Sequence, residues 1–157
     1  MFAIVDIEPS LLRRERERTR SLLAPVVPPE LLHEVGSTAM PGVIGKQDLD
    51  FLVRVPRAAF TGYRDRLDSL LTRNPDQLSN EVYQGYTIES ELDVAVQLTV
   101  ADGPHDTFLE FRELLRSDAA LVNEYNDLKR QFDGQPMDAY RKAKGSFIER
   151  TLRNEGL

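Results

Sequence analysis

The chain has 157 residues, enough to build a hydrophobic core, and with 41% hydrophobic and 29% charged residues its composition is that of a soluble globular protein. It contains no cysteine, which excludes disulfides, thiolate catalysis and zinc–thiolate sites, and its two histidines, His33 and His105, exclude a multi-histidine metal site. The formal net charge of −6 argues against broad electrostatic binding to nucleic acid, although it leaves room for a local basic groove.

No apolar run reaches the length of a membrane span, and the first ten residues, MFAIVDIEPS, lack the basic region of a signal peptide. We therefore expect a cytoplasmic protein without a membrane partner. No linker, repeat or low-complexity segment divides the chain. We expect one domain over residues 1–157, with a core at about 10–100 and a helical part at about 104–155.

Residues Ser10 to Leu23 are predicted to form a helix that Ser10 caps, because leucines recur along one narrow stripe. The run RRERER within it is expected to be a solvated helix face rather than a nucleic-acid contact. Pro25, Pro28 and Pro29 end this helix and lead to a strand.

The stretch from Leu31 to Val55 is predicted to form a strand, a tight turn, a glycine-rich connection and a second strand. In the second strand Asp48 and Asp50 point to one face, while apolar residues point to the other. Two carboxylates about 4 Å apart repel by roughly 4 kcal/mol at an effective dielectric of about 20, so one must be protonated or a cation must lie between them. Oxygen ligands favour Mg²⁺ or Mn²⁺. The alternative is a strand face that is simply polar.

Gly36 and Ser37 directly follow the first strand, where a close backbone approach and a hydroxyl donor suit a phosphate. We therefore expect this turn to bind a phosphate. Gly45-Lys46 is not a P-loop, because the required upstream glycine is missing and Gln47 follows the lysine.

Ala58 to Arg73 is predicted to be a second helix, and Asn80 to Ile88 a strand joined by a hairpin at Glu89–Glu91 to the strand Leu92–Val100. Asp93 lies on the strand face opposite the apolar residues, as Asp48 and Asp50 do in their own strand. If the two strands are neighbours in register, three carboxylates converge. Glu89 or Glu91 are alternative third ligands, and Asp93 is alternatively the start of a half-exposed strand.

The remainder is predicted to form three helices. The first is Asp106–Arg116, the second begins after a cap at Ser117 or Asp118, and the third is Met137–Asn154. Lys144 shares a helix side with apolar residues. It either reaches a substrate phosphate or packs its stem while the ammonium extends to water.

These residues carry a resemblance. Gly36-Ser37, the strand Asp48-Leu49-Asp50-Phe51 and Leu92-Asp93-Val94 resemble the signature of the nucleotidyltransferase superfamily typified by DNA polymerase β. Within it, the segments VGSTAMPGVIGK, FRELLRSDAALVNEYNDLKRQF and MDAYRKAKGSFIERTL resemble the GrpB family, also known as UPF0157. Many GrpB proteins have a histidine where this chain has Glu34, Ile where it has Asp48, and a His-x-His strand where it has Val94–Thr99.

The resemblance implies an α+β fold, with a mixed β-sheet flanked by helices and a C-terminal group of about three helices. It implies a Mg²⁺- or Mn²⁺-dependent nucleotidyltransferase that moves a nucleoside monophosphate from an NTP to an acceptor hydroxyl. Asp48, Asp50 and Asp93 would bind metal, and Gly36, Ser37 and Thr38 would contact the phosphates of the nucleotide. Lys46, Lys144 and Arg112 would neutralise the leaving pyrophosphate. The alternative is a non-catalytic, antitoxin-like module on the same fold that binds a nucleotide, RNA or protein.

Overall fold

The computed structural model describes residues 1–46 and 48–154. In this part of the chain, five strands form one mixed sheet in the order β1-β2-β5-β4-β3. The strands are Leu32–Val35 (β1), Asp48–Val55 (β2), Thr72–Arg73 (β3), Tyr83–Ile88 (β4) and Asp93–Val100 (β5). β2 and β5 are parallel, and the other neighbouring pairs are antiparallel. The expected α+β class with a mixed sheet is confirmed.

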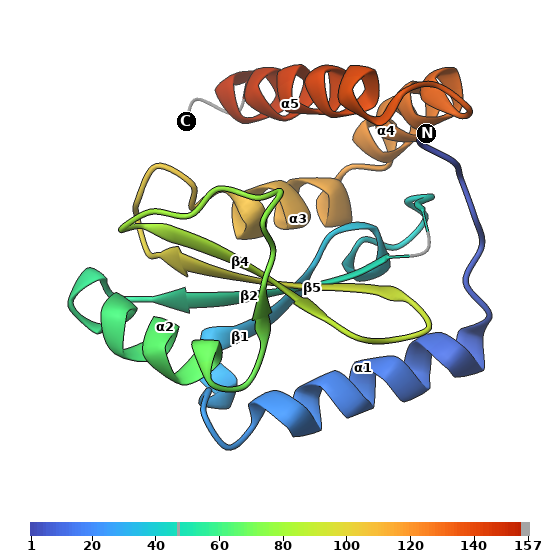
Figure 1. Ribbon diagram of the computed structural model, residues 1–157. Coiled ribbons are helices and arrows are strands. Elements are labelled where there is room, and N and C mark those ends of the chain that lie inside the picture. Colours follow the sequence, from blue (N-terminus) through green and yellow to red (C-terminus); the bar gives the residue numbers. More distant parts are fainter. Residues whose placement is uncertain (47, 155–157) are drawn as a thin grey trace.

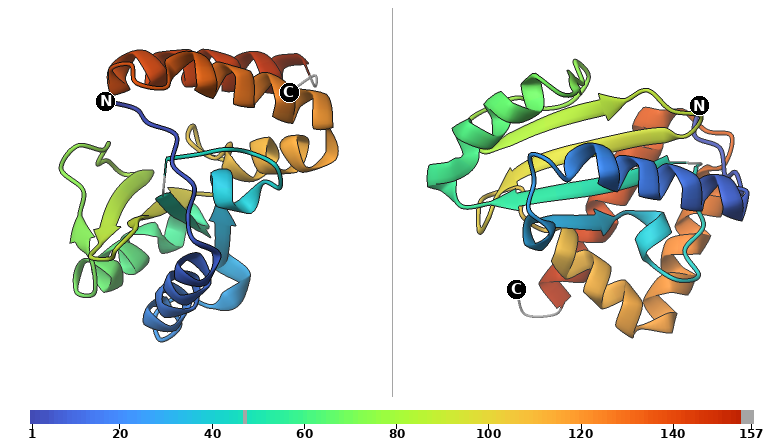
Figure 2. Two further views of the ribbon diagram at one scale, coloured as in Figure 1. Left: turned by 90° about the vertical axis from the view of Figure 1, so that its right-hand side faces the viewer. Right: turned by 90° about the horizontal axis from the view of Figure 1, so that it is seen from below.

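Helices lie on both sides of this sheet (Figures 1 and 2). One face carries α1 (Pro9–Leu23) and α2 (Phe60–Asp68). The other faces α3 (Phe108–Ser117), α4 (Ala119–Phe132) and α5 (Met137–Asn154), the expected C-terminal helical group. None of the helices among the described residues combines the length and apolar character that crossing a membrane requires.

The alternation of side chains in the two central strands separates a core face from a polar face. Leu49, Phe51, Val94 and Val96 are buried on the face that packs against Leu23 of α1 and Leu67 of α2. Burying apolar side chains of this size stabilises the fold by about 1.5–3 kcal/mol each. The polar face of the same strands, with Asp48 and Asp93, points toward the C-terminal helices.

The first helix begins one residue earlier than predicted and has a different cap. Glu8 is the N-cap, and its carboxylate accepts the backbone N–H of Ser10 at 3.1 Å and of Leu11 at 2.9 Å. Ser10 therefore lies inside the first turn, because a longer acidic side chain reaches the same free N–H groups. The prediction that RRERER is a solvated face is also partly wrong: Glu15 is 3% exposed, and Arg16 binds Glu34 of β1.

The second helix is shorter than predicted. It ends at Asp68, and Thr72 and Arg73 instead form β3, which pairs with Thr87 and Tyr86 of β4. An ion pair from Arg73 to Asp68 at 2.8 Å holds this bend. The apolar spacing of Leu70 and Leu71 continues the helical pattern, but pairing with the sheet edge decides the conformation.

The N-terminal segment connects the two helical layers (Figure 2). Phe2 is buried and stacks on Tyr140 of α5, with ring centroids 3.7 Å apart. Further along, the N–H of Val5 donates to the carbonyl of Gly45 at 2.9 Å, beside Lys46. This segment therefore links α5, α1 and the connection that leads into β2.

Candidate functional site

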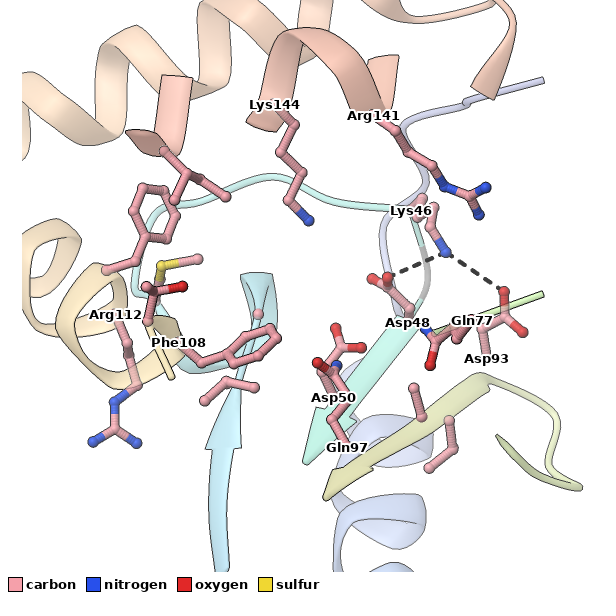
Figure 3. A pocket seen from close by; sticks show the side chains of 18 of the residues that line it. Lys46, Asp48, Asp50, Gln77, Asp93, Gln97, Phe108, Arg112, Arg141 and Lys144 are labelled. Carbon is pink, nitrogen blue, oxygen red and sulfur yellow. Dashed lines mark ion pairs between the residues drawn. The ribbon is translucent and has the colours of Figure 1, made fainter. Parts of the chain in front are cut away.

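The register of the two central strands brings the predicted carboxylates to one place. β2 and β5 are parallel neighbours, with Asp48 opposite Asp93 and Asp50 opposite Ala95. Because alternate residues of a strand share a face, all three aspartates lie on the polar face. Figure 3 shows them lining one cavity between the sheet and the C-terminal helices.

Gly36 is held against one of these carboxylates. Val35, the last residue of β1, pairs with Asp50, so the turn that follows passes directly beside it. Gly36 has φ of 76°, and a β-carbon at this position would collide with Oδ2 of Asp50. Only glycine meets both conditions without strain. The predicted glycine turn therefore abuts the carboxylate pair.

Ser37 begins the short 3-10 turn Ser37–Ala39. Its hydroxyl packs against Gly45, where an added β-carbon would collide with it. This contact draws the start and the end of the glycine-rich connection together, next to Asp48. Ser37 thus stands close to Asp48 but is not among the described residues that line the aspartate cavity, whereas Lys46 is. Their phosphate-binding roles stay predictions.

Lys46 lies between two of the aspartates. Its Nζ is 3.2 Å from Oδ2 of Asp48 and 3.6 Å from Oδ2 of Asp93, and the dashed lines of Figure 3 mark these ion pairs. The side chain of Asp48 is 18% exposed and that of Asp93 is 83% exposed. Lys46 therefore contacts one carboxylate on the cavity wall and another at its rim.

The pKa of Asp50 is also shifted by its surroundings. Burial, followed by the negative charge of Asp48, raises the pKa of Asp50 to about 7, against the opposing effect of Lys144, Lys46 and Lys129. The same surroundings raise the pKa of Tyr83 to about 12, through burial and then the charge of Asp50. The repulsion is reduced by the Lys46 ammonium beside Asp48, and the raised pKa of Asp50 favours its neutral form more than in water.

The cavity has a volume of about 380 Å³ and two chemically different ends. Lys144 and Arg141 of α5 add positive charge to that of Lys46, and Figure 3 shows the Lys144 ammonium directed toward the aspartates. Away from these cations the lining is apolar or aromatic, from Met40, Phe108, Phe111 and Ile148. A ligand with an anionic end and a flat apolar end matches this lining.

Two predicted phosphate ligands point elsewhere. The Thr38 hydroxyl donates to Oε2 of Glu34 at 2.8 Å and lines a different cavity. Arg112 lines the aspartate cavity, but its guanidinium donates to the Glu34 carbonyl at 3.0 Å and pairs with Glu113, and Figure 3 shows it directed away from the aspartates. Their phosphate-binding roles stay predictions.

Sequence patterns missed Lys129. It is 4% exposed, lies 4.6 Å from the ring centroid of Tyr125, and donates from Nζ to the carbonyl of Ile44 at 2.5 Å. Burial, followed by the charge of Lys144, lowers the pKa of Lys129 to about 7, while Asp48 and Asp50 oppose the shift. The only signal was its spacing of four residues from Tyr125, which places both on one side of α4.

Asn126, three residues earlier on α4, completes the same contact. Its Oδ1 accepts the N–H of Ile44 at 3.0 Å and its Nδ2 donates to the carbonyl of Gly42 at 2.8 Å. Together Asn126 and Lys129 fix the backbone of the connection that presents Lys46. Arg141 was also missed, although its spacing of three residues from Lys144 places both on one side of α5.

The donor set suits a hard divalent cation, because it consists of carboxylate oxygens that already face a cation, the Lys46 ammonium. Within residues 1–46 and 48–154, however, no three or more His, Asp or Glu side chains are arranged to hold a metal ion. The three aspartate positions are together, but the three-carboxylate metal site stays a prediction.

The chain matches a known protein family over most of its length. The family model described as GrpB protein matches residues 4–154. The chain belongs to the GrpB family. This membership confirms the resemblance that the glycine-serine turn and the C-terminal helices indicated.

Two relatives named as UPF0157 proteins support the assignment to the GrpB family. One, from Vibrio cholerae, is 30% identical over 139 residues, covering 83% of this chain and 70% of the relative. The other, from Halalkalibacterium halodurans, is 29% identical over 153 residues, covering 92% of this chain and 76% of the relative.

The GrpB fold is shared with a solved structure. The conserved protein GrpB from Enterococcus faecalis superposes with a TM-score of 0.67 at 18% identity, covering 98% of this chain and 99% of that chain. A cytoplasmic RNA terminal U-transferase matches with a TM-score of 0.49 at 16% identity, over 77% of this chain and 38% of that chain. A likeness as low as the second gives no information on function.

Proposed function

We propose that this member of the GrpB family is a Mg²⁺- or Mn²⁺-dependent nucleotidyltransferase that moves a nucleoside monophosphate from an NTP to an acceptor hydroxyl. The observation that carries the proposal is the parallel register of Asp48 and Asp93, which puts both on one wall of a cavity with Asp50. Cations from Lys46, Lys144 and Arg141 and an apolar end complete the lining that a nucleoside triphosphate needs.

In this proposal Asp48 and Asp50 hold the divalent cation, and Asp93 contributes from the neighbouring strand. A bound divalent cation would neutralise the triphosphate and stabilise charge on the attacking and leaving oxygens. It would also favour the ionised form of Asp50, whose pKa is raised to about 7 without it.

The phosphates are held by the residues of the cationic end. The Ser37 hydroxyl and the backbone of Gly36 approach the β- or γ-phosphate, and Lys46 and Lys144 balance the charge of the departing pyrophosphate. Lys46 has to leave Asp48 and Asp93 to do so, which is an exchange of one set of anions for another. The base would lie against the apolar end, where Phe108 offers a ring for stacking.

In this proposal Asp93 takes the proton of the acceptor hydroxyl. Its carboxylate is the most exposed of the three, at 83%, and stands at the rim where an acceptor would enter. Proton transfer to a positioned carboxylate contributes about 10²–10⁴-fold to a rate. Positioning and electrostatics supply most of the remaining catalysis in phosphoryl chemistry.

The test is release of pyrophosphate from each of the four NTPs with Mg²⁺ or Mn²⁺, together with NTP binding by calorimetry. We expect cation-dependent binding, and its loss in Asp50→Asn and Asp48→Asn. Glu149→Gln, an exposed change on α5, serves as the control. Turnover or binding that is unchanged in Asp50→Asn would refute the proposal. Cation-dependent binding without pyrophosphate release, with acceptors supplied, would favour the non-catalytic nucleotide-binding module instead.

A further inference from the structure

A second cavity, of about 390 Å³, lies at the outer edge of β1. Its walls come from α1 and α3, which lie on opposite faces of the sheet (Figure 1). Each helix contributes two arginines four residues apart, so that both arginines of a pair lie on one helix side. They are Arg16 and Arg20 of α1 and Arg112 and Arg116 of α3.

The charge of this arginine cavity is positive in a chain whose net charge is −6. Glu34 is the one acid among the described residues that line it. Arg16 already neutralises Glu34, through Nε at 2.6 Å and Nη2 at 3.0 Å, and the Thr38 hydroxyl donates to the same carboxylate. Arg20 is 4.0 Å from Glu34, with a side chain 47% exposed.

Each arginine of α3 contacts one backbone oxygen and one exposed acid. Arg112 donates to the Glu34 carbonyl at 3.0 Å, and Arg116 donates from Nε to the Ala39 carbonyl at 2.8 Å. Both also pair with Glu113, at 2.9 Å and 3.3 Å, which is 58% exposed and outside the cavity lining. An exposed acid of this kind contributes only about 0–1 kcal/mol per pair. The guanidinium groups of Arg20, Arg112 and Arg116 therefore retain N–H donors for a ligand.

His33 reports the same positive field. It points from β1 into the arginine cavity, and burial, followed by the charges of Arg112, Arg54 and Arg20, lowers its pKa. Its imidazole is therefore neutral near pH 7 and offers a further N–H donor.

We propose that the arginine cavity binds a phosphate monoester. A single carboxylate is matched by one planar guanidinium, whereas guanidinium groups that line one cavity from two helices can surround a tetrahedral dianion. The site does not depend on the nucleotidyltransferase proposal, since it shares only Arg112 with the aspartate cavity. Because Arg112 lines both cavities, a phosphate monoester bound here would lie beside the aspartate cavity.

The test begins with calorimetric titration of inorganic phosphate into the whole protein at low ionic strength. We expect saturable binding that weakens about tenfold or more in Arg20→Gln and in Arg116→Gln, because each removes a charge-assisted hydrogen bond. Arg130→Gln, which removes an exposed arginine paired with Asp127 on α4, is the matched control and should not change the affinity. Lys144→Gln separates the two cavities, because phosphate bound only in the aspartate cavity would weaken in this variant and not in Arg20→Gln.

The source of the phosphate is resolved by two further ligand pairs: adenosine monophosphate against adenosine, and a 5′-phosphorylated oligoribonucleotide against the same oligonucleotide with a 5′-hydroxyl. Tighter binding of one phosphorylated ligand names a small molecule or an RNA end as the source. The proposal is overturned if wild-type protein shows no saturable phosphate binding, or if Arg130→Gln weakens it equally. It is also overturned if Lys144→Gln alone abolishes binding. Should Arg116→Gln fail to fold, Arg20→Gln decides, because its side chain is half exposed.

Discussion

Lys46 and Asp48 form an ion pair of 3.2 Å on the wall of the aspartate cavity, and the same ammonium lies 3.6 Å from Asp93. A positive charge on the chain itself therefore occupies the space between two carboxylates from different strands. Any other cation that binds there competes with Lys46, and any polyphosphate that draws Lys46 away frees the carboxylates. The two binding events should favour one another for this electrostatic reason.

Replacing Lys46 with Met should therefore have opposite effects on two ligands. Mn²⁺ alone, measured by electron paramagnetic resonance at pH 8, should bind about fivefold more tightly, because a competing ion pair worth on the order of 1 kcal/mol is removed. Binding of an NTP should weaken. Lys142→Met, which removes an exposed lysine of α5, is the control. Weaker Mn²⁺ binding in Lys46→Met would show that the lysine does not compete with the cation.

Asp50 should make the protein less stable as the pH rises. Its pKa is raised from 3.8 to about 7 in the folded chain. Between these values the folded state keeps a proton that the unfolded state has lost, so the free energy of unfolding falls through this window, by an amount on the order of a few kcal/mol. Asp50→Asn should remove this loss and exceed the wild type in stability at pH 8, but not at pH 4.5, in urea denaturation.

Asp93→Asn is the matched control for that measurement, because the Asp93 side chain is 83% exposed. It should change the free energy of unfolding by less than about 0.5 kcal/mol at either pH. A stability difference between Asp50→Asn and wild type that is the same at pH 4.5 and pH 8 would contradict the assignment.

Lys129 should act in the next pH window with the opposite sign. Its pKa is lowered from 10.5 to about 7, so between these values the unfolded state holds a proton that the folded state has released. Stability due to this group rises as the pH increases from about 7 toward 10. In Lys129→Met the free energy of unfolding should gain less than in wild type between pH 7 and pH 10. Identical gains in the two proteins would place a charged Lys129 in the fold at neutral pH.

Gly36→Ala should lower stability for two separable reasons, a φ of 76° and a collision of the new β-carbon with Asp50. We expect a loss of about 2–3 kcal/mol by thermal or urea unfolding. Gly134→Ala is the control for φ alone, because Gly134 has φ of 83° with nothing near its added β-carbon, and should cost about 1 kcal/mol. The double change Gly36→Ala with Asp50→Ala should recover part of the loss, and additive losses would argue against the contact.

Much of the site could be predicted from local sequence. The spacing of Asp48 and Asp50 places them on one face of any strand, and the apolar alternation around Asp93 fixes its face in the same way. The turn at Gly36 was predictable because a glycine follows an apolar strand. The contact of Gly36 with Asp50 was not, because it depends on the antiparallel pairing of Val35 with Asp50.

The errors arose where distant segments compete with local preference. Leu70 and Leu71 continue the apolar period of α2, yet Thr72 and Arg73 pair with β4. Arg16 sits in a run of charges typical of a solvated helix, yet it reaches a buried Glu34. The spacing of Lys129 from Tyr125 does not predict burial of a charged group, which the packing of α4 on the Gly42–Ile44 backbone explains.

The sequence by itself determined which side chains share a face, because the repeats of strand and helix follow from backbone geometry alone, and it determined membership in the GrpB family. The tertiary structure alone decided that Asp48 lies opposite Asp93, that Lys46 stands between them, and that four arginines of α1 and α3 meet at the edge of β1. Those arrangements depend on contacts between residues far apart in the chain, and the free energy of such contacts is set by packing and charge in three dimensions rather than by neighbours in sequence.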